Sequence, residues 1–362
     1  MKDLRIAEDI RDASTLPADI YRDPELYRQQ VERVFARSWQ LASWNDPTPE
    51  RETAAPLTLL PRCLDEPLLV THDASGTRHL LSNVCTHRGN MLVDTACTMR
   101  SIRCRYHGRR FGLDGRFAHM PEFEEARGFP SPTDDLPRVP SARLGPLLFA
   151  GIRPAQSFES WLGPLAERFA FVPWDRLKVD EERHYEVDAH WALYCDNYLE
   201  GFHIPFVHAS LADGLDYGEY STETFEWGSL QVGIGKEGED LLDLPASHPD
   251  HGRNVAALYA FLFPSTMINV YGWGVSINAV QPLGPNRTRI VFLSLVSDAS
   301  RRSRGVGADL HRVEMEDEAI VESVQRGVRS RLYHRGRFSP SREIGVHHFH
   351  RLLGRSMIDE ER

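Results

Sequence analysis

The most restrictive pattern in the sequence is a set of two cysteines and two histidines in its first half. Cys85-x-His87 is followed, after sixteen residues, by Cys104-x-x-His107. Each half supplies one thiolate and one imidazole, so two loops brought together can give two sulfurs to one iron and two nitrogens to the other iron of a [2Fe-2S] cluster. A structural zinc site is the alternative, but a zinc finger places both cysteines in one half and both histidines in the other. The order of the ligands therefore favours the iron-sulfur cluster.

Glycines follow both halves of this pattern. Gly89 and Gly108 occupy positions where the backbone must turn tightly and can direct N–H groups toward cluster sulfurs. The stretch Cys-Arg-Tyr-His-Gly that ends at Gly108, with the Asp-Gly turn at 114–115, resembles the second cluster loop and hairpin of the Rieske oxygenases. Those oxygenases commonly carry Trp where this chain has Arg109, so we expect the packing around the cluster to differ there.

The remaining cysteines do not form a disulfide framework. Cys63, Cys97 and Cys195 are an odd set, which argues against a secreted, disulfide-stabilised protein. Respiratory Rieske proteins carry a disulfide between their two cluster loops, whereas here the position three residues after His87 is Asn90. This difference favours the oxygenase branch. Cys97 lies between the loops and is expected to be a small buried residue rather than a fifth ligand.

Length and composition indicate a globular protein of two domains. The chain has 362 residues, of which 41% are hydrophobic, and its net charge of −10 argues against nucleic acid as a partner. The longest apolar run, at about 255–263, is far shorter than the ~20 residues of a membrane span, and no apolar leader is visible. We therefore expect a cytoplasmic protein that does not contact a membrane.

Hydrophobic periodicity separates the two domains. Residues 23–39 predict an amphipathic helix. From about Leu57 the pattern changes to short strand-like runs between Asp/Gly turns, such as residues 67–71 and 79–81. These runs predict a small antiparallel domain that ends near Pro154.

A second antiparallel sheet is predicted from residues 267–270, 275–280 and 289–296, which are separated by glycine turns. Before it, residues 233–238 match the dinucleotide fingerprint Gly-x-Gly-x-x-Gly, but a Pro/His/Asp-rich segment follows in place of a helix. We therefore expect a hairpin or loop there, and NAD(P)H binding by a separate protein.

A second motif of possible metal ligands follows the first domain. On a helix, Asp196, Glu200 and His203 fall at i, i+4 and i+7, and so share one face. His208 would point about 140° away from His203 on an ideal helix. Pro205 is expected to break the helix and let His208 swing back toward His203.

A long helix is predicted downstream, over residues 308–332. Its apolar stripe is formed by Leu310, Val313, Ile320, Val324 and Val328. Asp317 falls within that stripe, where a carboxylate is costly unless it meets a metal or a cation. The neighbouring Glu314, Glu318 and Glu322 are expected to form the solvated flank.

Two histidines and one aspartate are the ligand set of non-haem iron(II), and they leave positions open for O2 and substrate. An isolated pair such as His203 and His208 would more often be two ordinary buried histidines. However, the order Asp-Asn-Tyr-Leu-Glu-x-x-His-x-x-x-x-His, which ends at His208, and the spacing from Asp317 to Glu322 are similar to the iron-ligand motifs of Rieske oxygenase catalytic subunits. With the cluster motif, this resemblance spans nearly the whole chain.

The resemblance implies an α+β fold. It consists of an N-terminal helical segment (1–40) packing on the catalytic domain, a small antiparallel β Rieske domain (41–155), and a helix-grip catalytic domain (156–362). The expected [2Fe-2S] ligands are Cys85, His87, Cys104 and His107. The expected ligands of a mononuclear Fe(II) are His203, His208 and Asp317, and the expected catalytic residues are Glu200, Asp196 and Asn197.

The resemblance also implies an activity and partners. A separate flavin or iron-sulfur reductase, either directly or through a ferredoxin, passes electrons from NAD(P)H to the cluster, and these reach the iron through His107, Glu200 and His203. Head-to-tail homotrimers would bring one chain's cluster to the next chain's iron. The C-terminal segment 336–350 is similar to the choline monooxygenase branch, which favours hydroxylation or N-dealkylation of a quaternary or tertiary amine.

Other functions stay open at this point. They are an aromatic ring-hydroxylating dioxygenase, a Rieske electron carrier without oxygenase activity, and a zinc-stabilised binding protein. Metal content distinguishes the classes, at about three irons per chain for an oxygenase, about two for a carrier, and zinc for the last.

Two further groups of residues could belong to a site. His347, His348 and His350 are expected to lie on a structural C-terminal helix rather than to form a metal cluster. The candidates for an aromatic lining, at least half of which should be core, are Phe202, Phe206, Trp227, Tyr259, Phe261, Phe263, Tyr271 and Trp273. His190, where the family often has Asn, has no explanation from the sequence.

Overall fold

The computed structural model describes residues 3–358, and the chain divides into two compact units. One unit comprises residues 39–154. The other combines the N-terminal segment up to Ser38 with everything from Ala155 onward. The class is α+β, as predicted.

The 39–154 unit consists of small antiparallel sheets. Their strand orders are β4-β3-β2-β5, β1-β10-β9 and β6-β7-β8. The predicted runs at 67–71 and 79–81 correspond to β3 and β4. The strands are β1 (Gln40–Ser43), β2 (Thr53–Leu59), β3 (Glu66–His72), β4 (Arg78–Ser82), β5 (Cys97–Thr98), β6 (Ile102–Arg103), β7 (Arg110–Phe111), β8 (Phe117–His119), β9 (Ser141–Leu144) and β10 (Leu147–Ala150).

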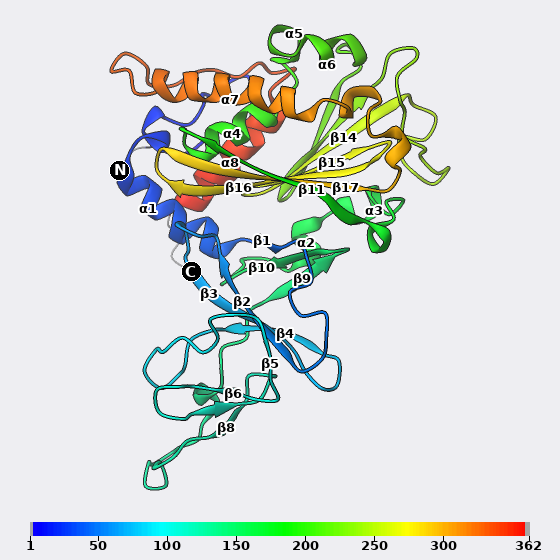
Figure 1. Ribbon diagram of the computed structural model, residues 1–362. Coiled ribbons are helices and arrows are strands. Elements are labelled where there is room, and N and C mark those ends of the chain that lie inside the picture. The colour runs from blue at the N-terminus through cyan, green and yellow to red at the C-terminus, as the bar shows by residue number, and fades with distance from the viewer. Residues whose placement is uncertain (1–2, 359–362) are drawn as a thin grey trace. The chain divides into compact units, whose positions relative to one another are not determined.

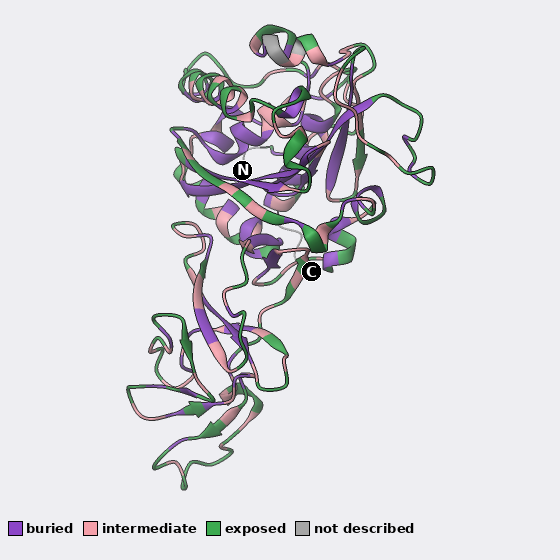
Figure 2. Ribbon diagram, turned by 45° about the vertical axis from the view of Figure 1, so that its right-hand side comes forward, coloured by how far each residue is buried: buried purple, intermediate pink, exposed green. Residues whose placement is uncertain are grey.

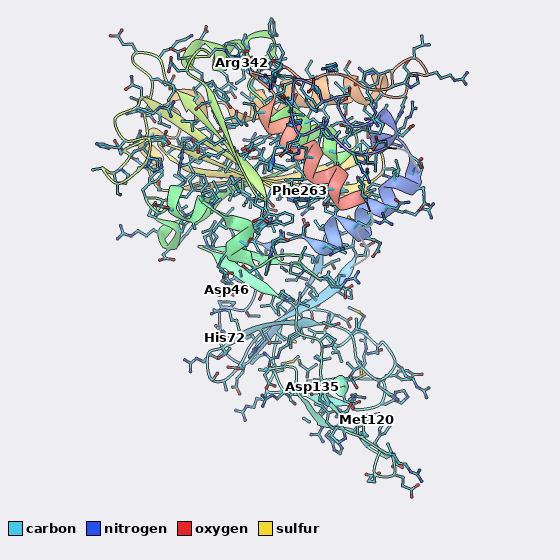
Figure 3. The ribbon with its side chains drawn as sticks, turned by 180° about the vertical axis from the view of Figure 1, so that it is seen from behind. Asp46, His72, Met120, Asp135, Phe263 and Arg342 are labelled. Carbon is cyan, nitrogen blue, oxygen red and sulfur yellow. The ribbon has the colours of Figure 1, made fainter. Side chains whose placement is uncertain are left out.

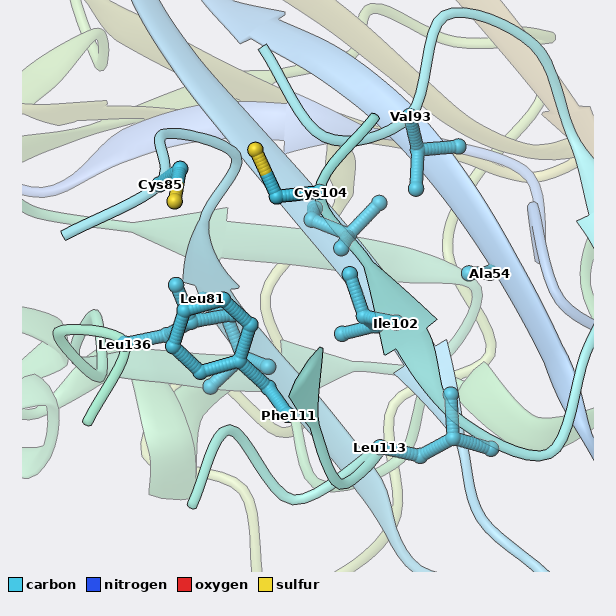
Figure 4. Packing of buried hydrophobic residues seen from close by; sticks show 10 residues of the cluster. Ala54, Leu81, Cys85, Val93, Ile102, Cys104, Phe111, Leu113 and Leu136 are labelled. Atoms are coloured by element: carbon cyan, nitrogen blue, oxygen red, sulfur yellow. The ribbon is translucent and has the colours of Figure 1, made fainter. Parts of the chain in front are cut away.

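The core of this unit includes two of the cysteines. Cys85 and Cys104 are buried together with Leu81, Ile102 and Phe111, as Figure 4 shows. Polar side chains fix the loops around this core. For example, His72, labelled in Figure 3, pairs through Nδ1 with the Thr48 carbonyl at 3.1 Å. Cys97 is exposed, so the prediction that it is buried was wrong. It lies on β5, a two-residue edge strand whose residues are both exposed.

The second unit is built on a seven-stranded antiparallel sheet of order β11-β17-β16-β15-β14-β13-β12. The three predicted strands are confirmed as β15, β16 and β17. The strands are β11 (Lys178–Val187), β12 (Ser221–Phe225), β13 (Gly228–Ile234), β14 (Val255–Leu262), β15 (Thr266–Tyr271), β16 (Gly274–Gly284) and β17 (Arg287–Val296). Of the fingerprint at 233–238, Gly233 and Ile234 lie at the end of β13, and the rest opens a loop that reaches β14, as expected for a hairpin or loop; no helix that could bind a dinucleotide follows there.

Helices gather on one side of this sheet, as Figure 1 shows for α4, α7 and α8. The α-helices are α1 (Pro24–Arg33), α2 (Phe158–Leu162), α3 (Leu165–Arg168), α4 (Trp191–Tyr198), α5 (Ile204–Val207), α6 (Ala209–Gly214), α7 (Leu310–Gly327) and α8 (Ile344–Met357). The central strands are buried on both faces, which Figure 2 shows as a continuous purple sheet. Short 3-10 turns lie at Ala18–Tyr21, Phe35–Arg37, Pro132–Asp134, Trp174–Arg176, Ala299–Arg301 and Gly305–Gly307.

Two predicted helices are shorter than expected. The helix predicted over 23–39 ends at Arg33, and a 3-10 turn at Phe35–Arg37 leads into β1. Asp23 begins it by accepting the N–H of Glu25. The helix predicted over 308–332 is α7, which ends at Gly327, where the chain turns away. No helix among residues 3–358 is both long and apolar enough to cross a membrane.

The buried face of α7 was predicted only in part: Val328 is buried and Leu310 and Val313 are half-buried, as expected for the apolar stripe. Ile320 and Val324, placed in the apolar stripe, are 40% and 43% exposed. The residues of α7 that are buried are Glu314, Val321 and Gln325. The polar members of this face have partners elsewhere in the fold, such as the N–H of His190, which donates to Gln325 Oε1 at 2.7 Å. Such partners come from distant segments, so helical periodicity alone does not reveal that these polar residues are buried.

Candidate metal centres

The two Cys/His loops have the same backbone construction. The N–H of Gly89 donates to the carbonyl of Cys85 at 3.0 Å, and the N–H of Gly108 donates to the carbonyl of Cys104 at 3.0 Å. Both glycines adopt positive φ, at 69° and 77°. This conformation strains residues with a Cβ, so the glycines close both turns without that cost.

Each of the two thiols affects the pKa of the other, and both share their surroundings with backbone donors. Burial raises the pKa of Cys85, whereas the N–H of His87 opposes that shift. Burial also raises the pKa of Cys104, but the N–H groups of Tyr106 and His107 and the Cys85 thiol outweigh it, and the net shift is downward. Backbone N–H groups directed at both sulfurs suit thiolates that carry negative charge.

The two imidazoles of these loops face each other. The ring centroids of His87 and His107 lie 4.8 Å apart. Nδ1 of each ring is buried and has no hydrogen-bond partner among the residues that the structure describes. A buried nitrogen without a partner is costly, unless it binds something that the protein chain itself does not supply. Two buried sulfurs and two such nitrogens fit a [2Fe-2S] cluster with mixed ligands.

Arg109 takes the place of the usual tryptophan and is buried beside these loops, with 2% of its surface exposed. Its guanidinium lies over the rings of Phe111, Phe117 and Phe129, at 5.6, 5.1 and 5.6 Å from their centroids. Nη2 pairs with Asp134 Oδ1 at 2.7 Å. Arg109 thus replaces one aromatic ring with a cation that binds several rings and one carboxylate.

The second centre brings together the two histidines and the aspartate singled out in the sequence. Their ligand atoms all lie within 4.8 Å of one another. His208 Nε2 is 2.9 Å from Asp317 Oδ1, and His203 Nε2 is 3.5 Å from the same oxygen. The donor set of two imidazoles and one carboxylate fits a non-haem iron(II). His203 lies just before α5, His208 just after it, and Asp317 in the middle of α7.

Each of these three side chains is fixed by a hydrogen bond with a further residue. Glu200 Oε1 lies 2.7 Å from His203 Nδ1, and Glu316 Oε2 lies 2.7 Å from His208 Nδ1. Asn197 Nδ2 donates to Asp317 Oδ1 at 2.6 Å. A carboxylate on Nδ1 fixes the proton there and leaves Nε2 free to bind a metal. Glu316 was missed in the sequence, where it is one of several acidic residues on a long helix.

The prediction that Asp196 shares a helix face with Glu200 and His203 was wrong. The helix α4 ends at Tyr198, and Asp196 instead accepts from Tyr21 Oη at 2.8 Å and pairs with His350 Nε2 at 2.9 Å. Asp196 therefore contacts the N-terminal segment and α8, and its catalytic role stays a prediction.

The turn after α4 explains this difference. Glu200 accepts the backbone N–H groups of Phe202 and His203, which closes a turn. A Cβ at Gly201 would lie 2.8 Å from the ring of Tyr220, so only glycine fits there without a shift. Pro205 does not break a continuous helix as predicted, because it lies in the first turn of α5, where proline is well tolerated.

A cavity adjoins the second centre. Its aromatic lining consists of Tyr194, Tyr198, Tyr220, Tyr259, Tyr271 and Phe292. Only Tyr259 and Tyr271 were among the eight aromatic candidates. Trp273, for example, is fully buried behind the lining and stacks on Tyr271 with centroids 5.4 Å apart. Burial raises the pKa values of the Tyr194, Tyr198, Tyr220 and Tyr271 hydroxyls well above that of an exposed tyrosine. These hydroxyls therefore stay protonated, and the rings are neutral.

Two of the three glutamates that were expected on the solvated flank of α7 are buried or half-buried. Glu314 is buried and lines the cavity, and burial raises its pKa to about 8. Glu318 is half-buried, and burial raises its pKa to about 7. The partner of Glu314 is Tyr194, 120 residues earlier in the chain, so neighbouring residues gave no signal of this burial.

The C-terminal histidines lie on α8, as predicted, and bind different partners. His347 pairs with the Ala7 carbonyl at 2.8 Å, and His348 pairs with the Phe225 carbonyl at 2.7 Å. His350 receives the N–H of Leu16 at Nδ1. These contacts are structural.

Comparison with known proteins identifies the family. Residues 174–359 match the catalytic domain of the ring-hydroxylating alpha subunit, and residues 50–133 match the Rieske [2Fe-2S] domain. The chain belongs to the Rieske oxygenase alpha-subunit family. It is therefore an oxidoreductase that incorporates O2, and its cofactors are a [2Fe-2S] cluster and a mononuclear non-haem iron. Its electrons come from a separate reductase. The catalytic domain distinguishes this Rieske oxygenase from an electron carrier.

Individual relatives of this Rieske oxygenase act on quaternary amines, according to their names. Choline monooxygenase of Arabidopsis thaliana is 34% identical over 361 residues, which cover 94% of this chain and 82% of that protein. The carnitine monooxygenase oxygenase subunit of Escherichia coli K12 is 29% identical, with 96% and 95% coverage. A solved structure of a quaternary ammonium Rieske monooxygenase superposes with a TM-score of 0.77 at 22% identity, over 99% of both chains.

Proposed function

We propose that this Rieske oxygenase hydroxylates or oxidatively N-dealkylates a small quaternary or tertiary amine. The observation that carries the proposal is the cavity beside His203, His208 and Asp317, which is lined by neutral aromatic rings. The faces of tyrosine and phenylalanine rings attract ammonium groups by cation–π interaction. The names of the relatives point to the same substrate class.

We propose specific ligands for both metal groups. Cys85, Cys104, His87 and His107 would hold the [2Fe-2S] cluster, the histidines through their unpartnered Nδ1 atoms. His203, His208 and Asp317 would hold the mononuclear iron. When bound, the two groups supply stored electrons and the open coordination positions that O2 activation requires.

The residues around the iron ligands have a defined task. Glu200 holds the Nδ1 proton of His203, and Glu316 does the same for His208, so both rings keep a fixed tautomer and orientation. Asn197 orients the Asp317 carboxylate. We assign Glu200 a further role, in which it meets His107 of the partner subunit in a head-to-tail homotrimer. The description of inter-subunit electron transfer in the quaternary ammonium monooxygenase supports this arrangement.

Turnover with defined amines tests the proposal. The purified subunit, loaded with iron and supplied with NADH and a reductase, should consume O2 with choline, L-carnitine or γ-butyrobetaine. Each hydroxylation takes one O2, two electrons and two protons and yields a hydroxylated product and water. His208→Ala should abolish O2 uptake while the visible absorption of the cluster remains. Coupled turnover of an aromatic hydrocarbon, with none of the three amines, would contradict the proposal.

The trimer and the bridge need their own tests. Glu200→Gln should lower substrate-coupled turnover with the reductase and leave the reduction of the cluster by the reductase unchanged. Unchanged coupled turnover would reject the bridge. Sedimentation should give a mass of about three chains, as a closed ring of heterologous contacts requires. A location in the cytoplasm also stays a prediction.

A further inference from the structure

Glu314 is a buried carboxyl in the wall of the cavity that no step described above uses. Only 4% of its surface is exposed. Oε2 accepts a hydrogen bond from Tyr194 Oη at 2.7 Å. Oε1 is buried and has no hydrogen-bond partner among the described residues. A buried acceptor without a partner is costly, so its retention in a cavity wall points to a ligand.

A series of hydrogen bonds across the cavity wall runs toward this carboxyl. Tyr198 Oη donates to Asn269 Oδ1 at 2.6 Å, and Asn269 Nδ2 donates to Asn278 Oδ1 at 3.4 Å. Asn278 Nδ2 donates to Tyr194 Oη at 3.1 Å, and Tyr194 donates in turn to Glu314. Every donor in the series points toward Glu314, whose Oε2 accepts the last hydrogen bond. Such an aligned series stabilises negative charge at its end.

The other carboxylates that line the cavity are already engaged. Glu200 accepts from His203 and from two backbone N–H groups. Asp317 Oδ1 is shared by Asn197 and His208. Among the carboxyls that line the cavity within residues 3–358, Glu314 is therefore the one that neither holds a histidine ring nor belongs to the expected iron ligands.

We propose that Glu314 is the anionic partner of the substrate's ammonium group and that it sets the preference of this cavity for cations over neutral molecules of the same shape. The inference rests on the proposed function, because it assumes that the substrate is an amine. The aromatic rings then supply the contact surface, and the carboxylate supplies the charge.

The titration of the group agrees with this role. Burial raises the pKa of Glu314 to about 8, the hydrogen bond from Tyr194 opposes the shift, and the charges of Asp317 and Glu318 add to it. In the empty cavity the carboxyl is therefore mainly protonated at neutral pH, and no uncompensated charge is buried. A cation beside it favours the ionised form and displaces the proton.

A purely structural role makes a different prediction. If Glu314 served only to accept the Tyr194 hydrogen bond, glutamine would replace it, since the amide oxygen accepts the same bond. Replacement by glutamine would then leave ligand selectivity unchanged. Removal of the charge with the shape retained is therefore the informative substitution.

Binding of charged and neutral probes tests the inference. Dissociation constants are measured by calorimetry without O2 on the iron-loaded holoenzyme, for choline, for tetramethylammonium and for 3,3-dimethylbutan-1-ol, the neutral carbon analogue of choline. Glu314→Gln should weaken both cations at least about tenfold and change the neutral probe by less than about twofold. Glu322→Gln is the matched control on the same helix. Its carboxylate accepts the N–H of Asp188 at 3.1 Å outside the cavity, and all three affinities should stay unchanged.

The outcomes separate this inference from the proposed function. If the wild type binds neither cation, and turns over none of the three amines, the proposed substrate class fails. If it binds both cations and Glu314→Gln binds them equally well, or loses the neutral probe to the same extent, the role of Glu314 is rejected. Should the glutamine variant not fold, the double variant Glu314→Met with Tyr194→Phe removes both members of the hydrogen bond and must show the same selective loss.

Discussion

Glu316 Oε2 lies 2.7 Å from Nδ1 of His208, at the same distance that joins Glu200 Oε1 to His203 Nδ1. Each of the two histidines thus has its own carboxylate. The two carboxylates come from different parts of the chain, one from the turn after α4 and the other from α7. Because a carboxylate on Nδ1 also increases the basicity of Nε2, the pair should strengthen metal binding.

Glu316→Gln should therefore weaken Fe(II) binding by about tenfold or more, since the amide keeps a hydrogen bond and loses the charge. The measurement is Fe(II) affinity by competition with a chelator, and the [2Fe-2S] content serves as an internal standard. Arg312, which pairs with Glu316 at 3.1 Å and is exposed, offers a control. Arg312→Gln should change iron affinity by less than about twofold. Equal effects of the two substitutions would contradict a specific role of Glu316.

Arg109 and Asp134 should be strongly coupled in the 39–154 unit. Arg109→Met leaves Asp134 without its cation, and we expect a loss of about 3 kcal/mol in the free energy of unfolding. Asp134→Asn alone should cost a similar amount, and the double variant should recover part of it. Denaturation monitored by the cluster absorption gives the double-mutant cycle. Strictly additive losses would show that the rings around the guanidinium, rather than the ion pair, dominate.

Gly345 allows α8 to approach the residue that precedes Glu200. A Cβ there would lie 2.3 Å from the carbonyl oxygen of Leu199. Gly345→Ala should cost about 1–3 kcal/mol of stability and also weaken iron binding, because the displaced carbonyl adjoins Glu200. Gly327→Ala, at the end of α7, meets nothing within 4 Å and should be neutral or slightly stabilising in the same denaturation experiment. Similar losses in both variants would reject the close approach as the cause.

His190 should make the protein sensitive to acid. Burial lowers its pKa from 6.5 to about 3, so the folded state binds this proton less readily than the unfolded state. Its contribution to stability is complete above pH 6.5 and falls as the pH decreases, by about 2 kcal/mol at pH 5. His190→Asn keeps an acceptor for the N–H of Ala192 and removes the titration. Unfolding free energies at pH 7 and pH 5 should therefore differ less in the variant; parallel losses would exclude His190.

The sequence predicted the residues that meet at each centre better than it predicted the backbone that carries them. Metal binding requires thiolate, imidazole or carboxylate side chains at particular spacings in the sequence. Residues such as Cys85 and His203 could therefore be recognised from the motif around them. The prediction of a helix that continues through Glu200 was wrong because a turn forms there instead. The Glu200 carboxylate closes this turn, and Gly201 fits against Tyr220. That ring lies nineteen residues further along the chain, beyond the reach of local periodicity.

Long-range partners also explain why α7 was misread. Glu314 is tolerated inside because Tyr194 donates to it, and Gln325 because it accepts the N–H of His190. Glu316 gave no signal at all, since an acidic residue beside other acidic residues usually faces solvent. The cavity rings were missed for a similar reason: strands buried on both faces do not reveal which side chain meets an open space.

The contacts around Asp196 constrain how the protein is made. This carboxylate is held by Tyr21, near the beginning of the chain, and by His350, close to its end. A nascent chain still attached to the ribosome has translated the loop from Glu200 to His208 long before its last helix emerges. We therefore expect iron to be acquired only after α8 has been synthesised, and a chain that stops short of α8 to accumulate with its [2Fe-2S] domain assembled and its catalytic domain without metal.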